Sequence, residues 1–230
     1  MHIVMIPDGN RRYAKAHSVS NLESYVLCEQ RLYECSMRAF SIGVRYCTVR
    51  LGSLKNFCER PAEEVVVLLD VVNRFLMRTF PKDRLHPENN ISSNIVGEWG
   101  DIIRLRRIEH QLSRNPIPPE RAERVFQGGG RVLTLLVGFD VPERTQYVLN
   151  ELSRAKAKIS TLPRCMELGV KGLPKVDLWL RTGDRSSGER AIMNHDSCYF
   201  ATPTYWPDMT MDLFEDYLLS AERRFEERNA

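Results

Sequence analysis

Short apolar segments alternate along this chain with longer amphipathic segments, and this alternation restricts the fold more than any other feature. The short segments are rich in β-branched and aromatic residues and end at turn-forming residues, as buried strands do. The longer segments repeat apolar residues at helical spacing. We therefore predict strands at 2–6, 44–51, 94–97, 132–139 and 176–180, and helices at 21–42, 61–80, 102–111, 143–158 and 211–228.

Strands that alternate with helices predict βαβ units and an α/β fold with a largely parallel sheet. The chain has 230 residues, of which 43% are hydrophobic, which is enough for one sizeable domain around a buried core. No internal repeat, long low-complexity stretch or linker divides the sequence. We expect a single domain over residues 1–230, and we interpret residues 52–60 as a loop.

Charge and hydropathy exclude several classes of function. The 33 basic and 30 acidic residues leave a net charge of only +3, so the chain lacks the broad positive field of a nucleic-acid-binding protein. No apolar run approaches the roughly 20 residues of a membrane-spanning helix, and the first residues lack signal-peptide features. The six cysteines stand singly, without zinc-ligand spacing, as free thiols do in a reducing cytoplasm. We expect a cytoplasmic protein.

Chemically active side chains follow two of the predicted strands. After the strand at 2–6, the sequence Asp8-Gly9-Asn10-Arg11-Arg12 places a carboxylate at a tight turn, directly before two guanidinium groups. After the strand at 176–180, residues 181–188 read Arg-Thr-Gly-Asp-Arg-Ser-Ser-Gly. Ligands of an open parallel sheet bind beyond the carboxyl ends of its strands, so both segments are candidate binding sites.

The residue types in these two segments suit a diphosphate ligand. Glycine allows backbone amides to approach phosphate oxygens, and arginine binds those oxygens through paired donors. Aspartate is a hard oxygen ligand for Mg²⁺, which commonly uses one or two carboxylates together with phosphate oxygens. A solvated surface turn is the alternative for either segment alone. A nucleotide-binding P-loop is not indicated, because the sequence lacks GxxxxGK[ST].

Five motifs resemble, in order, those of the cis-prenyltransferases, the undecaprenyl diphosphate synthase family. Residues 2–14, HIVMIPDGNRRYA, resemble the opening signature H-x-x-x-I-x-D-G-N-G-R-W-A. Arg60-Pro61 matches the end of N-W-x-R-P, and residues 176–183, VDLWLRTG, resemble D-L-x-I-R-T-G-G. Residues 206–208, WPD, resemble W-P-D-F, and residues 222–225, ERRF, resemble R-R-F-G. The resemblance spans nearly the whole chain.

The resemblance implies a magnesium-dependent transfer of a prenyl group from an allylic diphosphate to a second isoprenoid diphosphate. Asp8 would bind the Mg²⁺, and Asp8 and Asn10 are the implied catalytic residues. The residues that would cradle the allylic diphosphate are Gly9, Asn10, Arg12 and Arg60. Those that would bind the second diphosphate are Arg181, Arg185 and Ser187.

The resemblance also implies an architecture. The family fold is a parallel sheet flanked by helices that enclose a hydrophobic pocket, and the family normally forms homodimers. In this chain the helix predicted from residue 61 has apolar side chains that could line such a pocket or simply pack in the core. A dry apolar pocket would protect the allylic carbocation that forms when the diphosphate leaves.

Several positions depart from the family pattern. The family glycine after D-G-N is Arg11, a family arginine falls at Asn21, and a family histidine falls at Tyr25. We count Arg11 and Tyr25 as substrate-binding residues, because Arg11 could supply the contact that is lost at Asn21. This pattern resembles the irregular branch of the superfamily, the cyclolavandulyl and lavandulyl diphosphate synthases, which couple short units.

The metal-binding residues of the family are incomplete in this sequence. A metal-binding glutamate of the family falls at Cys198 when the alignment runs back from Trp206. Asp184 and Asp196 are the candidates to replace it. The second diphosphate motif is also two residues shorter than in the family, between Asp184 and Arg185.

Four interpretations remain open from the sequence. The first is a short-chain, irregular synthase that joins dimethylallyl diphosphate to a second short diphosphate. The second is regular Z-chain elongation with isopentenyl diphosphate, and the third is prenyl transfer to a small acceptor without a diphosphate. The fourth is a non-catalytic subunit of a heteromeric synthase, which the presence of Asp8 with Arg11 and Arg12 argues against.

Overall fold

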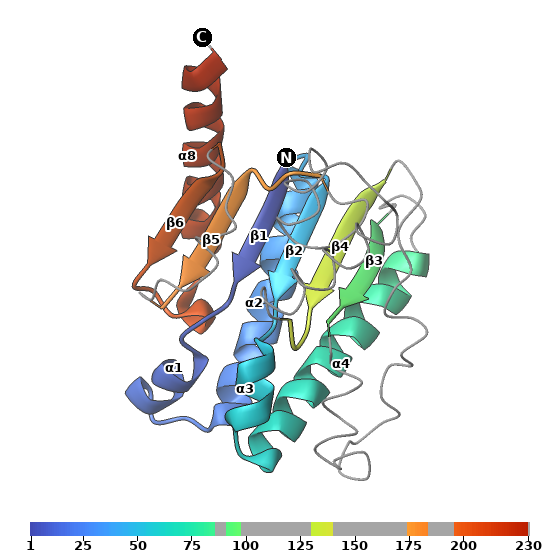
Figure 1. The fold of residues 1–230 in the computed structure, drawn as a ribbon, viewed down its shortest axis with the longest axis vertical. Coiled ribbons are helices and arrows are strands. Elements are labelled where there is room, and N and C mark those ends of the chain that lie inside the picture. The colour runs from blue at the N-terminus through green and yellow to red at the C-terminus, as the bar shows by residue number, and fades with distance from the viewer. Residues whose placement is uncertain (86–90, 98–129, 140–173, 184–195, 230) are drawn as a thin grey trace, which may run out of the picture.

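A computed structural model describes residues 1–85, 91–97, 130–139, 174–183 and 196–229. Six strands form one sheet in the order β3-β4-β2-β1-β5-β6, and every pairing in it is parallel (Figure 1). The strands are β1 (His2–Ile6), β2 (Tyr46–Arg50), β3 (Ile91–Val96), β4 (Arg131–Leu136), β5 (Leu178–Thr182) and β6 (Cys198–Thr202). The predicted α/β class and parallel sheet are confirmed.

The strand order reverses beside β1, and this reversal creates a binding crevice. The chain passes from β1 to β2 on one side, whereas β5 lies on the other side of β1. The strand order therefore reverses at β1, whose carboxyl end carries Asp8. Ligands of open α/β sheets bind at such a switch point. In Figure 1 the short helices α1 (Asn10–Ala16) and α3 (Leu54–Glu59) lie at this edge.

Three long helices complete the described part of the chain: α2 (Asn21–Ser41), α4 (Ala62–Leu85) and α8 (Met211–Asn229). The start of α2 is fixed by a capping box, in which Ser20 accepts from the Glu23 amide and the Glu23 carboxylate accepts from the Ser20 amide. Acidic residues occupy the first turn of α4, where the helix dipole favours negative charge. None of the described helices has the length and apolar character needed to cross a bilayer.

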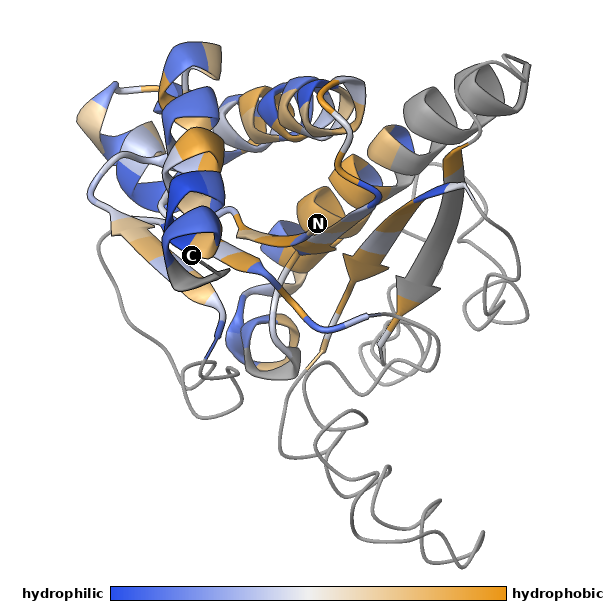
Figure 2. Cartoon of the chain, turned by 90° about the horizontal axis from the view of Figure 1, so that it is seen from above, coloured by the Kyte–Doolittle hydropathy of each residue, from blue (hydrophilic) through white to orange (hydrophobic). Residues whose placement is uncertain are grey.

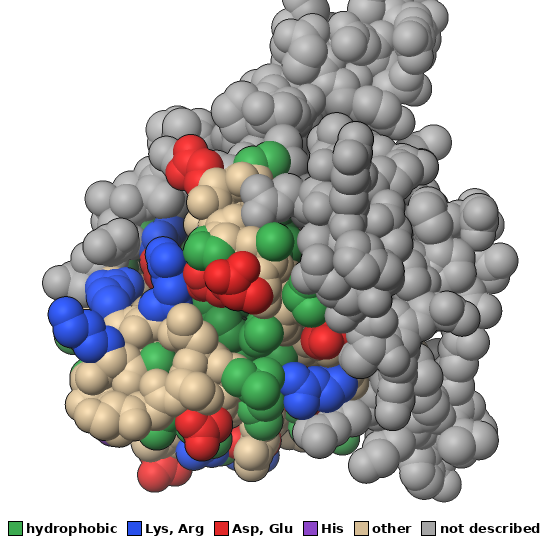
Figure 3. All heavy atoms as spheres, turned by 90° about the horizontal axis from the view of Figure 1, so that it is seen from below, with side chains coloured by type: hydrophobic (Ala, Val, Ile, Leu, Met, Phe, Trp, Pro, Cys, Tyr) green, Lys and Arg blue, Asp and Glu red, His purple; other side chains and the backbone are tan. Residues whose placement is uncertain are grey.

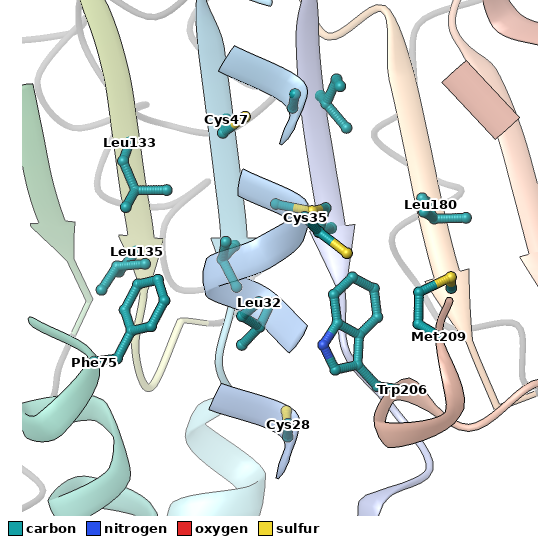
Figure 4. Close-up of a cluster of buried hydrophobic side chains, with 14 of the residues drawn as sticks. Cys28, Leu32, Cys35, Cys47, Phe75, Leu133, Leu135, Leu180, Trp206 and Met209 are labelled. Carbon is teal, nitrogen blue, oxygen red and sulfur yellow. The ribbon is translucent and has the colours of Figure 1, made fainter. Parts of the chain in front are cut away.

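The main hydrophobic core lies between one face of the sheet and these three helices. Leu32 of α2, Phe75 of α4 and Phe214 of α8 belong to the same buried cluster as Ile3 and Met5 of β1. Figure 4 shows Leu32 and Phe75 beside the strands, with Trp206 packed between α2 and β5. In Figure 2 the strands are mostly hydrophobic, whereas α8 alternates between polar and apolar residues along its length. This is the pattern of a helix that buries only one face.

Most of the predicted elements are present, but the structure corrects the sequence analysis at three places. Residues 52–60 are not a loop throughout, because α3 forms there with Ser53 as its N-cap and Phe57 buried against Gly52. The turn at Asp8 leads directly into α1, which the sequence analysis missed, and β6 was missed as well. The helices predicted at 102–111 and 143–158 lie outside the described residues.

A buried histidine connects β1 to β2 and to the segment that precedes β5. The Nδ1 of His2 lies 3.0 Å from the carbonyl oxygen of Pro174, which can only accept, so Nδ1 must donate. The Nε2 lies 2.9 Å from the Thr48 hydroxyl, which donates to it when the ring is neutral. Burial lowers the pKa of His2 from 6.5 to about 4. The neutral ring is therefore the form that fits the fold.

This pKa shift predicts a loss of stability at mildly acidic pH. The unfolded chain takes up a proton on His2 below pH 6.5, whereas the folded chain does so only near pH 4. The free energy of unfolding should therefore fall by about 3 kcal/mol as the pH drops through this window. Denaturant unfolding between pH 7 and 4.5 should show that His2→Gln has a flatter pH dependence than the wild type. If His2→Gln kept the wild-type slope, the pH dependence would not arise from His2.

Candidate active site

Asp8 lies directly beyond β1, at the point where the strand order reverses. The Thr182 hydroxyl accepts from the Asp8 amide at 2.9 Å and donates to the Asp8 carbonyl at 2.7 Å, which fixes the backbone of Asp8 to the end of β5. The Gly9 amide donates to Asp8 Oδ1 at 2.6 Å and orients the carboxylate. The side chain remains 36% exposed, so a ligand can reach it.

Two arginines converge on this carboxylate. Arg181, the fourth residue of β5, places Nη2 at 2.9 Å from Asp8 Oδ2 and is only 9% exposed in its side chain. Arg12 places Nη2 at 3.6 Å from Asp8 Oδ1 and lies over the ring of Tyr205. A buried guanidinium is costly without a partner, so Asp8 both compensates for Arg181 and limits the net positive charge of the group. The two arginines form a site suited to an anion.

Glycine is required at two positions of this group. Gly9 has φ of +96°, and a Cβ there would lie 2.7 Å from the ring of Tyr205. Gly183 has φ of +81°, and a Cβ there would collide with the guanidinium of Arg12. Both positions have a left-handed backbone that favours glycine, and a side chain at position 183 would also displace the guanidinium of Arg12. Gly9 also serves as the N-cap of α1, which carries Asn10, Arg11 and Arg12.

A second cluster joins α2 to α4 on the opposite side of the crevice. Tyr25 donates its hydroxyl proton to Glu64 Oε1 at 2.8 Å. Arg60 Nη1 donates to the Tyr25 oxygen at 2.8 Å and to Glu64 Oε1 at 3.0 Å. Arg11 Nε lies 3.7 Å from the same carboxylate oxygen. Burial raises the pKa of Tyr25 well above its usual range, with Arg60 acting in the opposite direction, so Tyr25 remains a neutral donor at physiological pH.

The remaining predicted site residues fall into two groups. Asn10 begins α1, donates its side-chain amide to the Pro7 carbonyl at 2.9 Å and accepts from the Ser24 hydroxyl through its own backbone carbonyl. It therefore secures the turn and connects α1 to α2. Arg185 and Ser187 lie outside the described residues, so the structure does not place them.

A cavity of about 560 Å³ connects these groups, and its size is typical of a small-molecule site. One end, here called the rim, is polar and is lined by Asp8, Arg12, Tyr25, Arg60 and Arg181. The other end, here called the floor, is apolar and is lined by Leu32, Leu68, Val72 and Phe75. Figure 3 views the edge at which the strands end and shows apolar side chains between groups of basic side chains. The predicted hydrophobic pocket is present.

The structure adds polar residues that the sequence analysis did not assign to the site. Arg50, at the end of β2, and Glu29, on α2, both line the cavity. Glu64 does not line it but accepts hydrogen bonds from Tyr25 and Arg60, which do. Arg50 could have been assigned to the site from the sequence, because it lies at the end of a predicted strand. Nothing in the sequence pairs Tyr25 with Glu64, because this contact depends on how α2 packs against α4.

The position of the missing family glutamate, Cys198, and the candidate metal ligand Asp196 both lie away from Asp8. Cys198 is buried at the start of β6, opposite Leu178, whereas Asp8 lies beyond the end of β1. Asp196 precedes β6 and pairs with Lys175, which precedes β5. A five-residue strand spans roughly 16 Å, so Cys198 and Asp196 lie at the opposite edge of the sheet from the site. The suggestion that Asp196 replaces the family glutamate is therefore wrong, and Asp184 lies outside the described residues.

Within the described ranges, no three His, Cys, Asp or Glu side chains are arranged to bind a metal ion. Asp8 alone nevertheless has the chemistry of a magnesium ligand. Its carboxylate is partly exposed, accepts only two close donors among the contacts given above, and has lone pairs that remain available. A site of one carboxylate completed by phosphate oxygens is typical of Mg²⁺.

Comparison with known proteins identifies the family. The model of the family described as "Putative undecaprenyl diphosphate synthase" matches residues 6–229. The ditrans,polycis-undecaprenyl-diphosphate synthase ((2E,6E)-farnesyl-diphosphate specific) of Aliivibrio fischeri is 27% identical over 97% of this chain and 87% of its own length. The tritrans,polycis-undecaprenyl-diphosphate synthase (geranylgeranyl-diphosphate specific) of Picrophilus torridus is 26% identical over 90% of this chain and 81% of its own length.

A solved structure supports the same fold. Lavandulyl diphosphate synthase from Lavandula x intermedia, in complex with dimethylallyl diphosphate, superimposes with a TM-score of 0.70 at 20% identity, covering 96% of this chain and 94% of that one. Because the family model covers nearly the whole sequence and the fold agrees, the chain belongs to the undecaprenyl diphosphate synthase family and is a prenyltransferase.

Proposed function

We propose that this prenyltransferase uses Mg²⁺ to transfer a short prenyl group, dimethylallyl or similar, from its diphosphate to a second short isoprenoid diphosphate. The observation that carries the proposal is the cavity itself, which joins a polar rim to an apolar floor. A prenyl diphosphate has the same division, with an anionic head and a hydrocarbon tail. Its head would lie at the rim and its tail would point toward the floor.

The residues of the rim suit the bond-breaking step. When the C1–O bond of an allylic diphosphate breaks, its electron pair leaves with the diphosphate, and negative charge builds up on the oxygens. Arg12, Arg60 and Arg181 line the place where that charge would develop, and donors held in position there stabilise it without reorganising. Mg²⁺ bound by Asp8 and the diphosphate would neutralise the leaving group further. The apolar floor would exclude water from the carbocation.

The completion of the reaction follows from the chemistry of the two substrates. The double bond of the second substrate attacks the C1 carbon, and a carbon–carbon bond forms. The released diphosphate then takes a proton from the carbon next to the resulting cation, which leaves a new double bond and balances the charge. Arg181 belongs to the second motif but bonds to Asp8 of the first, so it could contact the diphosphate of either substrate. Homodimerisation and an irregular, lavandulyl-type product remain part of the proposal on the resemblance alone.

Regular elongation with isopentenyl diphosphate is the second candidate, since the relatives from Aliivibrio fischeri and Picrophilus torridus are named as undecaprenyl diphosphate synthases. The departures at Arg11 and Tyr25 and the modest volume of the cavity favour a short product. Analysis of the product separates these two candidates.

Mass spectrometry of the products is the direct test. The purified protein would be incubated with Mg²⁺ and dimethylallyl diphosphate alone, and then with isopentenyl diphosphate added. We expect a ten-carbon diphosphate from dimethylallyl diphosphate alone. A product that forms only when isopentenyl diphosphate is present would replace the irregular assignment by regular elongation. If neither tube contained a product, the proposed five-carbon allylic substrate would be wrong, and farnesyl and geranylgeranyl diphosphate, which the named relatives use, would be tested next.

Asp8 should be essential for turnover. Asp8→Asn keeps the shape of the side chain but removes the charge that would hold Mg²⁺, so kcat should fall by a factor of roughly 10² to 10³. The matched variant Asp212→Asn, which changes an exposed aspartate in the first turn of α8, should keep wild-type activity. Steady-state kinetics at saturating Mg²⁺ measure both variants. Equal activity of Asp8→Asn and the wild type would contradict the proposed role.

Substitutions in the cluster of Tyr25, Arg60 and Glu64 should lower kcat/KM by different amounts. Tyr25→Phe removes the hydrogen bond donated to Glu64 and the one accepted from Arg60 but leaves the Arg60–Glu64 ion pair, so kcat/KM should fall roughly tenfold. Arg60→Ala removes a charged donor, so kcat/KM should fall about a hundredfold or more. Tyr33→Phe, elsewhere on α2, serves as the control. The assigned order of importance would be wrong if Tyr25→Phe were the more damaging change.

A further inference from the structure

A buried carboxylate in the cavity wall has no role in the proposed chemistry. Glu29 is only 2% exposed and lines the cavity together with Tyr25, Cys28 and Leu32. These four residues follow the spacing i, i+3, i+4 and i+7, so they share one face of α2. Buried glutamates are rare, because desolvation of the charged group is costly. A carboxylate among apolar side chains also makes contact with a hydrocarbon ligand unfavourable.

The position of Glu29 between the rim and the floor is set by the course of α2. Tyr25 lies at the rim, hydrogen-bonded to Glu64 at the start of α4. Glu29 is one helical turn further along, about 6 Å from Tyr25, and Leu32 follows after about another 4.5 Å. Figure 4 shows Leu32 one turn beyond Cys28, further from the carboxyl ends of the strands and beside Phe75. Glu29 therefore lies before the apolar floor.

A prenyl chain that extends from the rim would meet this carboxylate early. A five-carbon prenyl group is roughly 5 Å long, from carbon–carbon bonds of about 1.5 Å, so it would end near the level of Glu29. A fifteen-carbon chain would have to continue past Glu29 and displace whatever solvates or pairs with its carboxylate. Hydrocarbon offers no hydrogen bond in exchange, so this displacement costs binding energy.

We propose that Glu29 is a specificity-determining residue, which admits a five-carbon allylic diphosphate and disfavours a longer one. The inference rests on the proposed function, since it assumes that the allylic diphosphate lies at the rim with its tail toward Leu32 and Phe75. It assigns the selectivity to a polar barrier in the wall of the cavity rather than to the total volume of the cavity. Replacing the carboxylate by an apolar side chain of similar length should therefore open the path to the floor.

Binding of unreactive substrates tests this without requiring turnover. Calorimetry would measure the Kd of the thiolo analogues of dimethylallyl diphosphate and farnesyl diphosphate, with Mg²⁺ and below the micelle concentration of the longer one. In Glu29→Met, the ratio of the farnesyl Kd to the dimethylallyl Kd should fall at least tenfold relative to the wild type. Glu29→Gln, which preserves the shape of the side chain, should also lower this ratio, by a smaller factor. It is the deciding variant if Glu29→Met fails to fold.

A second glutamate of α2 provides the control. Glu34→Met changes another glutamate of α2, which pairs with Arg31 and does not line the cavity, so it should leave the ratio unchanged. If both analogues bind and neither Glu29 variant changes the ratio, the inference is overturned while the proposed function stands. If neither analogue binds to the wild type, the proposed function fails, and the inference fails with it.

Discussion

The ion pair between Asp8 and Arg181 connects two strands whose residues lie 173 positions apart in the sequence. Arg181 is nearly buried, and a buried guanidinium without a carboxylate would destabilise the protein by several kcal/mol. The pair is compatible only with a sheet in which β5 lies beside β1, and this adjacency places the reversal of strand order at the site. The turn at Gly9 and the start of α1 follow Asp8 directly, and Arg12 lies near the same carboxylate.

The rest of the cavity is built from helices that the sheet positions. Both α2 and α4 pack on the same face of the sheet, and their N-terminal parts meet at the rim through Tyr25 and Glu64, with Arg60 just before α4. Their following turns supply the floor. The charged residues that would act on the diphosphate therefore lie at the rim, and the apolar residues that would bind the prenyl group lie further in. This division suits a reaction in which a diphosphate leaves while its carbocation must avoid water.

The sequence predicted the parts of the site that depend on strand ends. Asp8 and Arg181 could be brought together because each follows or ends an apolar strand, and parallel strands share one carboxyl edge. It could not predict the contact between Tyr25 and Glu64, which depends on helix packing, nor Glu29, which reads as an ordinary surface glutamate of an amphipathic helix. The suggestion of Asp196 as a metal ligand failed because Asp196 precedes β6, at the opposite edge of the sheet from Asp8, and the sequence does not show which end of β6 faces the site.

The central claim is that one cavity binds the diphosphate at its rim and the prenyl group toward its floor. A crystal structure of the protein with Mg²⁺ and the thiolo analogue of dimethylallyl diphosphate measures this most directly. The account predicts the diphosphate among Arg12, Arg60 and Arg181, the metal on Asp8, and the five-carbon group between α2 and α4. A diphosphate bound elsewhere, or a prenyl group pointing away from Leu32 and Phe75, would contradict it.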